Sequence, residues 1–375
     1  MSVFHRVTLA ATAGAAGAVL AAGVALAPAA WASPHSFVGG FTHISKVAST
    51  VPKNGDLNPY GVAVATQSIG KLHKGDVLVS NFNDKANAQG TGTTIVEVAP
   101  NHTVSLFAQI SPKNLPGACP GGVGLTTALD ILPSGWVVVG SLPTVAGNPA
   151  SSEAGCLLVL NSVGRVVETI HGHGINGPWD MTAVSSLYRT NLFVTNVLNG
   201  TVAAGGKVVH KGTVLRLTLN TSPFKPPKLV AAIAIGSGFA EATNSAALVL
   251  GPTGVGLGPN GWLYVADTLN NRIAAIPHAL TRVTTAGVGA TVAKGVFVKG
   301  PLGVVIAPNG DVLTVNSQNG NLVEITPKGV QVAVKKLDTS SSPPGAGALF
   351  GLAVAPLGKG VYYVDDATNE LDLLH

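Results

Sequence analysis

The segment Gly251–Ile273 reads GPTGVGLGPNGWLYVADTLNNRI. Turn residues and short apolar runs alternate in it: a Gly-Pro-x-Gly turn, a strand, a Pro-Asn-Gly turn, a second strand and an Asp-led turn. A second copy spans Gly300–Asn316 and reads GPLGVVIAPNGDVLTVN. Two copies of one order of turns and strands indicate a repeated supersecondary unit and predict further copies elsewhere in the chain.

Four weaker copies follow the same order, which makes six units in all. These copies span 58–81, 127–141, 177–196 and 350–366. A third strand with alternating apolar residues follows each unit, at 94–98, 156–160, 213–217, 272–276, 321–325 and 370–374. Five units also offer a fourth strand, at 103–110, 165–170, 228–235, 291–298 and 331–337. The sixth unit has none, because the chain ends at His375, but the spare strand Thr42–Ser49 can complete it.

Six units of four strands predict an all-β fold, a six-bladed β-propeller of antiparallel blades whose last blade is completed by an N-terminal strand. A β-sandwich and a linear β-solenoid are the alternatives, and the split last blade favours the closed ring. The composition agrees, with 46% hydrophobic residues and 10% charged residues, against about 25% charged in ordinary domains. That balance excludes a charged coiled coil and a disordered chain, and the shortness of most apolar runs excludes a multi-span membrane protein.

The Gly251–Ile273 segment resembles an NHL repeat, and the chain as a whole resembles a secreted six-bladed NHL-type propeller of the wider gluconolactonase-like group. This group includes lactonases, strictosidine-synthase-like enzymes, amidating lyases and NHL domains that only bind partners. The resemblance therefore implies the fold without choosing a function.

The first 32 residues have the pattern of a secretory signal peptide, with Arg6, an apolar stretch to Ala27 and a small-x-small site at Ala30–Ala32. An uncleaved anchor is the alternative. Cleavage would leave one domain, residues 33–375, in an extracellular or periplasmic compartment. There, Cys119 and Cys156 are expected to form a disulfide rather than remain buried free thiols. Loss of Arg6 lowers the net charge from +5 to +4, and so small a positive charge does not indicate nucleic-acid binding.

The long connections between units are expected to share one face of the ring, because they join strand two to three or strand four to the next unit. They are 82–92, 142–155, 197–212, 236–250 and 338–349, and we call this side the insertion-rich face. Function usually resides on loops held by a rigid scaffold, which favours this face for binding over neutral loop drift.

One position opens every first strand and should rim the central funnel. Its residues are Tyr60, Thr127, Trp179, Thr253, Leu302 and Phe350. Gluconolactonase-like propellers use acidic and amide ligands for a metal at comparable positions. The apolar and aromatic set found here fits a stacking or apolar ligand better, or else simply plugs the funnel.

A second position closes every second strand with a small polar residue. Its members are Asn81, Ser141, Asn196, Asp267, Asn316 and Asp366, which can bond their own turns or form a polar ring at the funnel mouth. His171, His173 and Asp180 are weak candidates for a Zn²⁺ site. Asp130 and Asp180 lie inside first strands, either buried with perturbed pKa values or paired with turn amides. No Ser-His-Asp order, phosphate loop or dinucleotide motif is present.

These observations favour a secreted, monomeric binding scaffold without a cofactor or a membrane span in the mature chain. It would take a protein, glycan or small apolar ligand on the insertion-rich face. A metal-dependent lactonase-like hydrolase or an amidating-lyase-like enzyme is the alternative.

Overall fold

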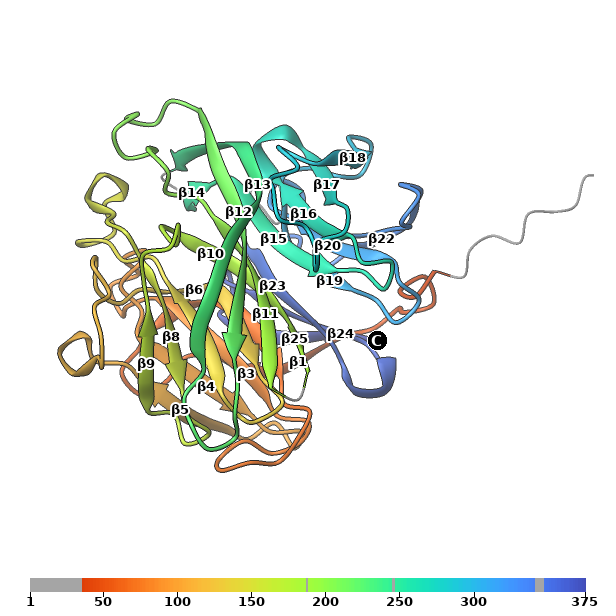
Figure 1. Ribbon diagram of the computed structural model, residues 1–375. Helices are drawn as coiled ribbons and strands as arrows, with labels where there is room; N and C mark the ends of the chain where they lie inside the picture. The colour runs from red at the N-terminus through yellow and green to blue at the C-terminus, as the bar shows by residue number, and fades with distance from the viewer. Residues whose placement is uncertain (1–35, 187, 245–246, 341–346) are drawn as a thin grey trace, which may run out of the picture. The chain divides into compact units, whose positions relative to one another are not determined.

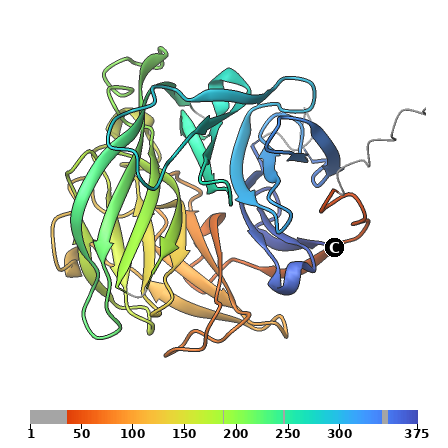
Figure 2. The same ribbon diagram turned by 45° about the vertical axis from the view of Figure 1, so that its right-hand side comes forward.

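The computed structural model describes residues 36–375 except 187, 245–246 and 341–346. The predicted signal peptide, 1–32, lies outside the described residues. Six antiparallel sheets follow one another in chain order around a ring, which confirms the six-bladed propeller (Figure 2). No helix in the described part of the chain has the length and apolar character needed to cross a membrane.

The blades are numbered along the chain, and Figure 1 labels most of their strands. Within each blade the strands lie side by side, with the first strand nearest the ring axis. Blades 1 to 3 are formed by β2 (Leu57–Val64), β3 (Val77–Asn83), β4 (Thr94–Val98) and β5 (Val104–Gln109); β6 (Leu125–Ile131), β7 (Val137–Ser141), β8 (Cys156–Leu160) and β9 (Val166–Ile170); and β10 (Pro178–Ser185), β11 (Arg189–Asn196), β12 (Val209–Asn220), β13 (Lys228–Asn244) and β14 (Leu248–Leu250).

Blades 4 to 6 have the same arrangement, with the chain ends combined in the last. They are formed by β15 (Pro252–Leu257), β16 (Leu263–Asp267), β17 (Arg272–Ile276) and β18 (Ala290–Lys294); β19 (Pro301–Ile306), β20 (Val312–Asn316), β21 (Asn321–Ile325) and β22 (Gln331–Lys336); and β23 (Leu349–Val354), β24 (Val361–Asp365), β25 (Glu370–Leu374) and β1 (Ile44–Ser49). Short 3₁₀ turns occur at η1 (Pro112–Asn114), η2 (Pro149–Ser151), η3 (Thr268–Asn270) and η4 (Pro356–Gly358).

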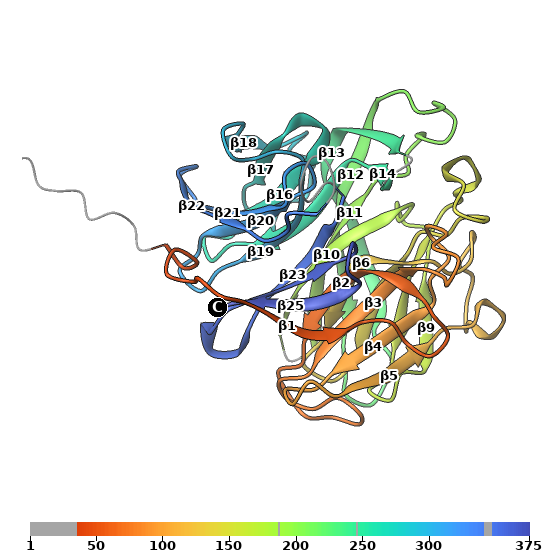
Figure 3. The ribbon, with the colours of Figure 1, turned by 180° about the vertical axis from the view of Figure 1, so that it is seen from behind.

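The predicted closure of the ring is confirmed, because β1 pairs with β25 in antiparallel register from Ile44 with Leu374 to Ser49 with Glu370 (Figure 3). The glycine that follows the rim position, in Pro301-Leu302-Gly303 and in Leu349-Phe350-Gly351, allows the innermost strands to approach closely. A Cβ at Gly303 would lie 2.0 Å from the carbonyl oxygen of Phe350, and one at Gly351 would lie 2.2 Å from that of Tyr60. The innermost strands of neighbouring blades thus approach too closely for a larger residue, including between blades 6 and 1.

Apolar side chains fill the spaces between adjacent sheets. Leu78 of blade 1 packs in one cluster with Leu158 of blade 2, and Leu157 of blade 2 packs in the next with Leu217 of blade 3. Because each sheet buries both faces, its strands need apolar and β-branched residues. This packing explains the low charge of the chain.

Blade 3 departs from the sequence-based expectation. Residues 236–250 were expected to form a loop, but β13 continues to Asn244 and β14 follows. The reason is that Val209 to Gly212 of β12 pair with Phe239 to Glu241 of β13, which extends the hairpin. The light-green connection between β11 and β12 projects beside this extension (Figure 1).

Candidate functional site

Three of the six predicted rim side chains converge on the ring axis. The ring of Tyr60 stacks on Phe350 with centroids 3.9 Å apart, and on Phe82 at 4.3 Å. The ring of Trp179 lies 6.3 Å from both Tyr60 and Phe350. All four rings are buried. They come from blades 1, 3 and 6, and we call these four residues the aromatic plug.

The other three rim residues, Thr127, Thr253 and Leu302, are also buried. The hydroxyl of Thr253 shares a hydrogen bond of 2.6 Å with that of Thr268. Burial, reinforced by the nearby Asp366 carboxylate, raises the pKa of Tyr60 well above its ordinary value. Tyr60, Trp179 and Phe350 lie near the starts of first strands, and Phe82 lies near the end of the second strand β3, so the plug closes the axis at the insertion-rich face.

A cavity of about 290 Å³ follows the aromatic plug along the ring axis, and we call it the channel. The first strands of all six blades line it with aliphatic side chains and backbone. Its lining residues follow Tyr60, Trp179 and Phe350 along the first strands, so the channel lies on the side of the ring where the first two strands of each blade are joined.

Asp130 and Asp180 are the carboxyl groups of the channel, and both lie in first strands as expected. Asp130 accepts hydrogen bonds from the amides of Ile131 and Ala183, and Asp180 from those of Met181 and Val255. Each carboxyl therefore joins its own blade to the next. Burial raises the pKa of Asp130 to about 7 and that of Asp180 well above its ordinary value, against the lowering effect of these amides.

The polar residues that close the second strands make local contacts. Asn81 donates to the carbonyl of Thr50, Ser141 accepts from the amide of Gly124, and Asn196 accepts from that of Asn176. Asn316 likewise accepts from Lys299, and Asp267 accepts from the guanidinium of Arg272. Four of these residues, Asn81, Ser141, Asn196 and Asn316, thus hydrogen-bond to the segment that leads into their own blade. Asp366 is half-buried, and a ligand-binding role for the ring stays a prediction.

The weak zinc candidates lie apart. His171 and His173 are exposed after β9 and line a surface cavity with Glu168 and Lys228, whereas Asp180 lines the channel. The expected chemistry of this set stays untested, and the structure does not gather the three side chains into one cavity.

The insertions of blades 1 and 2 contact each other. The amide of Thr144 donates to the carbonyl of Gly90 at 3.0 Å, and the Thr144 hydroxyl donates to that of Gln89. The predicted disulfide between Cys119 and Cys156 is confirmed, and it joins the segment before β6 to the first residue of β8, directly after the second insertion.

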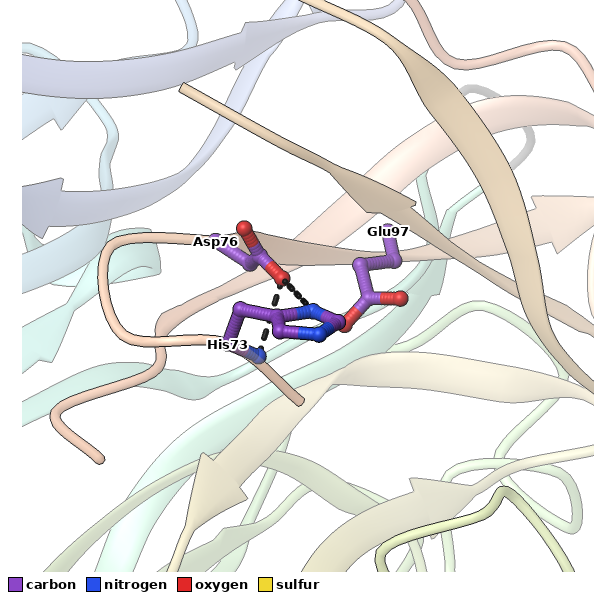
Figure 4. Close-up of side chains that lie close together, drawn as sticks. All are labelled: His73, Asp76 and Glu97. Carbon is purple, nitrogen blue, oxygen red and sulfur yellow. Dashed lines mark hydrogen bonds and ion pairs between the residues drawn. The ribbon is translucent and has the colours of Figure 1, made fainter. Parts of the chain in front are cut away.

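Sequence reasoning missed one group of side chains. His73, Asp76 and Glu97 of blade 1 place their ligand atoms within 4.8 Å of one another, on the β2–β3 connection and on β4 (Figure 4). Burial and then the charge of Asp76 raise the pKa of Glu97 to about 7. The signal was present as a Gly-Asp turn followed by a glutamate in the third strand, a pattern that recurs at Asp311 and Glu324.

No protein-family model and no curated protein matches the chain. Solved structures do match over most of the chain. A luciferin-regenerating enzyme is 10% identical with a TM-score of 0.55, over 88% of this chain and 94% of the other. A gluconolactonase from Xanthomonas campestris is 10% identical with a TM-score of 0.54, over 88% of each chain. A virginiamycin B lyase from Staphylococcus aureus is 15% identical with a TM-score of 0.50, over 88% and 98%. At these identities, the likeness shows the six-bladed propeller fold alone, and the NHL resemblance stays a prediction.

Proposed function

We propose that the protein is a secreted binding scaffold that recognises a protein or glycan with its insertion-rich face. The observation that carries the proposal is the hydrogen-bonded contact between the insertions of blades 1 and 2, through Thr144. Loops that are already ordered lose little conformational entropy on binding, so they suit recognition.

The aromatic plug supports recognition by the surface rather than by a funnel. The buried rings close the ring axis, so a ligand that approaches the insertion-rich face finds no open funnel there. The face offers exposed apolar side chains among polar loops, including Val145 of the second insertion and Phe297 before β19. Such mixed surfaces are typical of protein recognition sites.

The disulfide supports secretion, because such bonds persist in oxidising compartments. Cleavage of the predicted signal peptide after Ala32 would leave Ser33 as the first residue. N-terminal sequencing of the exported protein tests this, and an intact Met1 on the exported protein would contradict it.

A lactonase-like or lyase-like enzyme is the second candidate, favoured by the paired carboxyls in the channel. Burial raises the pKa of Asp130 to about 7, the range in which general acids and bases often act. Turnover of gluconolactone that is lost in both Asp130→Asn and Asp180→Asn would support this candidate and contradict the scaffold proposal.

The direct test compares variants on the two faces. Val145→Arg alters an insertion, whereas Leu357→Arg alters an exposed turn between β23 and β24 on the opposite face. Labelled proteins are titrated onto glycan and protein arrays and onto the surface of the producing cell. We expect Val145→Arg to weaken binding by about tenfold, as for an interface residue of moderate importance, and Leu357→Arg to leave it unchanged. The reverse result, or binding unaffected by either change, would contradict the proposal.

A further inference from the structure

The His73, Asp76 and Glu97 group lies outside the channel and the insertion-rich face. The Asp76 carboxylate accepts a hydrogen bond of 2.9 Å from the amide of His73, and one of its oxygens lies 3.2 Å from His73 Nδ1. In Figure 4, the Glu97 carboxylate lies beside the same imidazole ring. Asp76 and Glu97 are buried, whereas the His73 side chain is 71% exposed, so the group opens to solvent through the histidine.

Glu97 lacks the partners that a buried carboxylate needs. It is only 7% exposed, its Oε2 accepts a long bond of 3.4 Å from the Ser105 hydroxyl, and no described group donates to its Oε1. A buried charged oxygen without a donor is costly, so either a shared proton or a cation must satisfy it. The unpaired oxygen belongs to the side chain that faces His73 and Asp76.

Blade 5 provides an internal comparison. Asp311 and Glu324 occupy the repeat positions of Asp76 and Glu97, before the second strand and within the third. There, Glu324 accepts hydrogen bonds from the Ser36 hydroxyl and the amides of Phe37 and Val38. The same acidic pair is thus covered by chain donors in blade 5.

In blade 1, no described chain segment supplies donors of this kind to Glu97 Oε1, and a histidine lies beside the pair. A cation at this position would do for Glu97 what the Ser36–Val38 segment does for Glu324.

We infer that His73, Asp76 and Glu97 form a binding site for a divalent transition-metal ion, with Zn²⁺ as its best-fitting representative. One imidazole nitrogen with two carboxylates is a donor set that Zn²⁺ accepts, whereas Ca²⁺ and Mg²⁺ favour oxygen alone. Ligands of a tetrahedral zinc ion at bonds of about 2.1 Å lie about 3.4 Å apart. The 3.2 Å between His73 Nδ1 and Asp76 Oδ2 is close to that separation.

Zinc titration of the purified protein tests the inference. We expect one Zn²⁺ per chain by calorimetry and by metal analysis after dialysis, with no competition from Ca²⁺ or Mg²⁺. Zinc should also raise the thermal unfolding temperature, because a ligand that binds the folded state stabilises it. His73→Ala and Glu97→Gln should each weaken zinc binding by at least about tenfold and abolish the thermal shift.

Matched controls separate this site from adventitious binding. His171→Ala removes an exposed histidine elsewhere and should leave both the stoichiometry and the affinity unchanged. His73 is exposed, so its substitution should not prevent folding even if that of Glu97 does. The absence of zinc binding would mean that Asp76 and Glu97 share a proton, and it would overturn the inference. Zinc binding that survives His73→Ala, or that is lost in His171→Ala, would also overturn it.

Discussion

Truncation of Phe350 should destabilise the fold by a measurable amount, because its ring packs in the aromatic plug. Phe350 is 1% exposed and stacks on Tyr60 at a centroid distance of 3.9 Å. Removal of a buried phenylalanine ring lowers the free energy of unfolding by about 3–5 kcal/mol. The lost stacking between the two rings accounts for about 1 kcal/mol of this cost. We therefore expect Phe350→Ala to lower the free energy of unfolding by about 4 kcal/mol.

The assay is guanidinium denaturation followed by circular dichroism, with the midpoint and slope compared between variants. Phe224→Ala is the matched control, because this ring is 90% exposed on the β12–β13 turn and its loss should cost less than about 0.5 kcal/mol. A cost below about 1 kcal/mol for Phe350→Ala would refute the plug, because it would mean that the rings are not packed together.

Three further predictions concern the rest of the ring. Cys119 and Cys156 are 37 residues apart, and replacing both with Ser should lower the free energy of unfolding, measured by denaturation, by about 4 kcal/mol. An unchanged free energy of unfolding would contradict the view that the disulfide restricts the unfolded chain. Burial raises the pKa of Asp130 from 3.8 to about 7, so its stabilising contribution is complete in acid and lost as pH rises through 7. The stability advantage of the wild type over Asp130→Asn should therefore shrink from pH 4 to pH 8, and a constant difference would contradict this cause. Glu324→Gln should expose the Ser36–Val38 segment to proteolysis, and unchanged cleavage would show that the carboxylate does not hold that segment.

The fold could be predicted because each blade repeats a local pattern with a physical cause. The glycine that follows the rim position is required where Gly351 meets the backbone of Tyr60, and the spare strand before the first unit had only β25 as a partner. The extension of β13 was missed because its Gly-rich and Ala-rich sequence resembles a loop. It becomes a strand only through pairing with β12.

The sites were less predictable, because they depend on contacts between blades. The apolar character of Tyr60, Trp179 and Phe350 was evident from sequence, but an open rim and a closed plug require the same residues. Only the observed stacking distinguishes them. In the sequence, Glu97 is one residue of an alternating strand, and no neighbouring residue indicates that His73 lies beside it in the fold.

The most direct test of the account is the solvent access of Trp179. The central claim is that the plug closes the ring axis beneath the insertion-rich face. A protein whose only tryptophan is Trp179 is compared with one whose only tryptophan is Trp262, which is partly exposed on a turn. The account predicts blue-shifted emission from Trp179 and acrylamide quenching several-fold weaker than that of Trp262. Equal quenching of the two would contradict it, because the axis would then be open to ligands from that face.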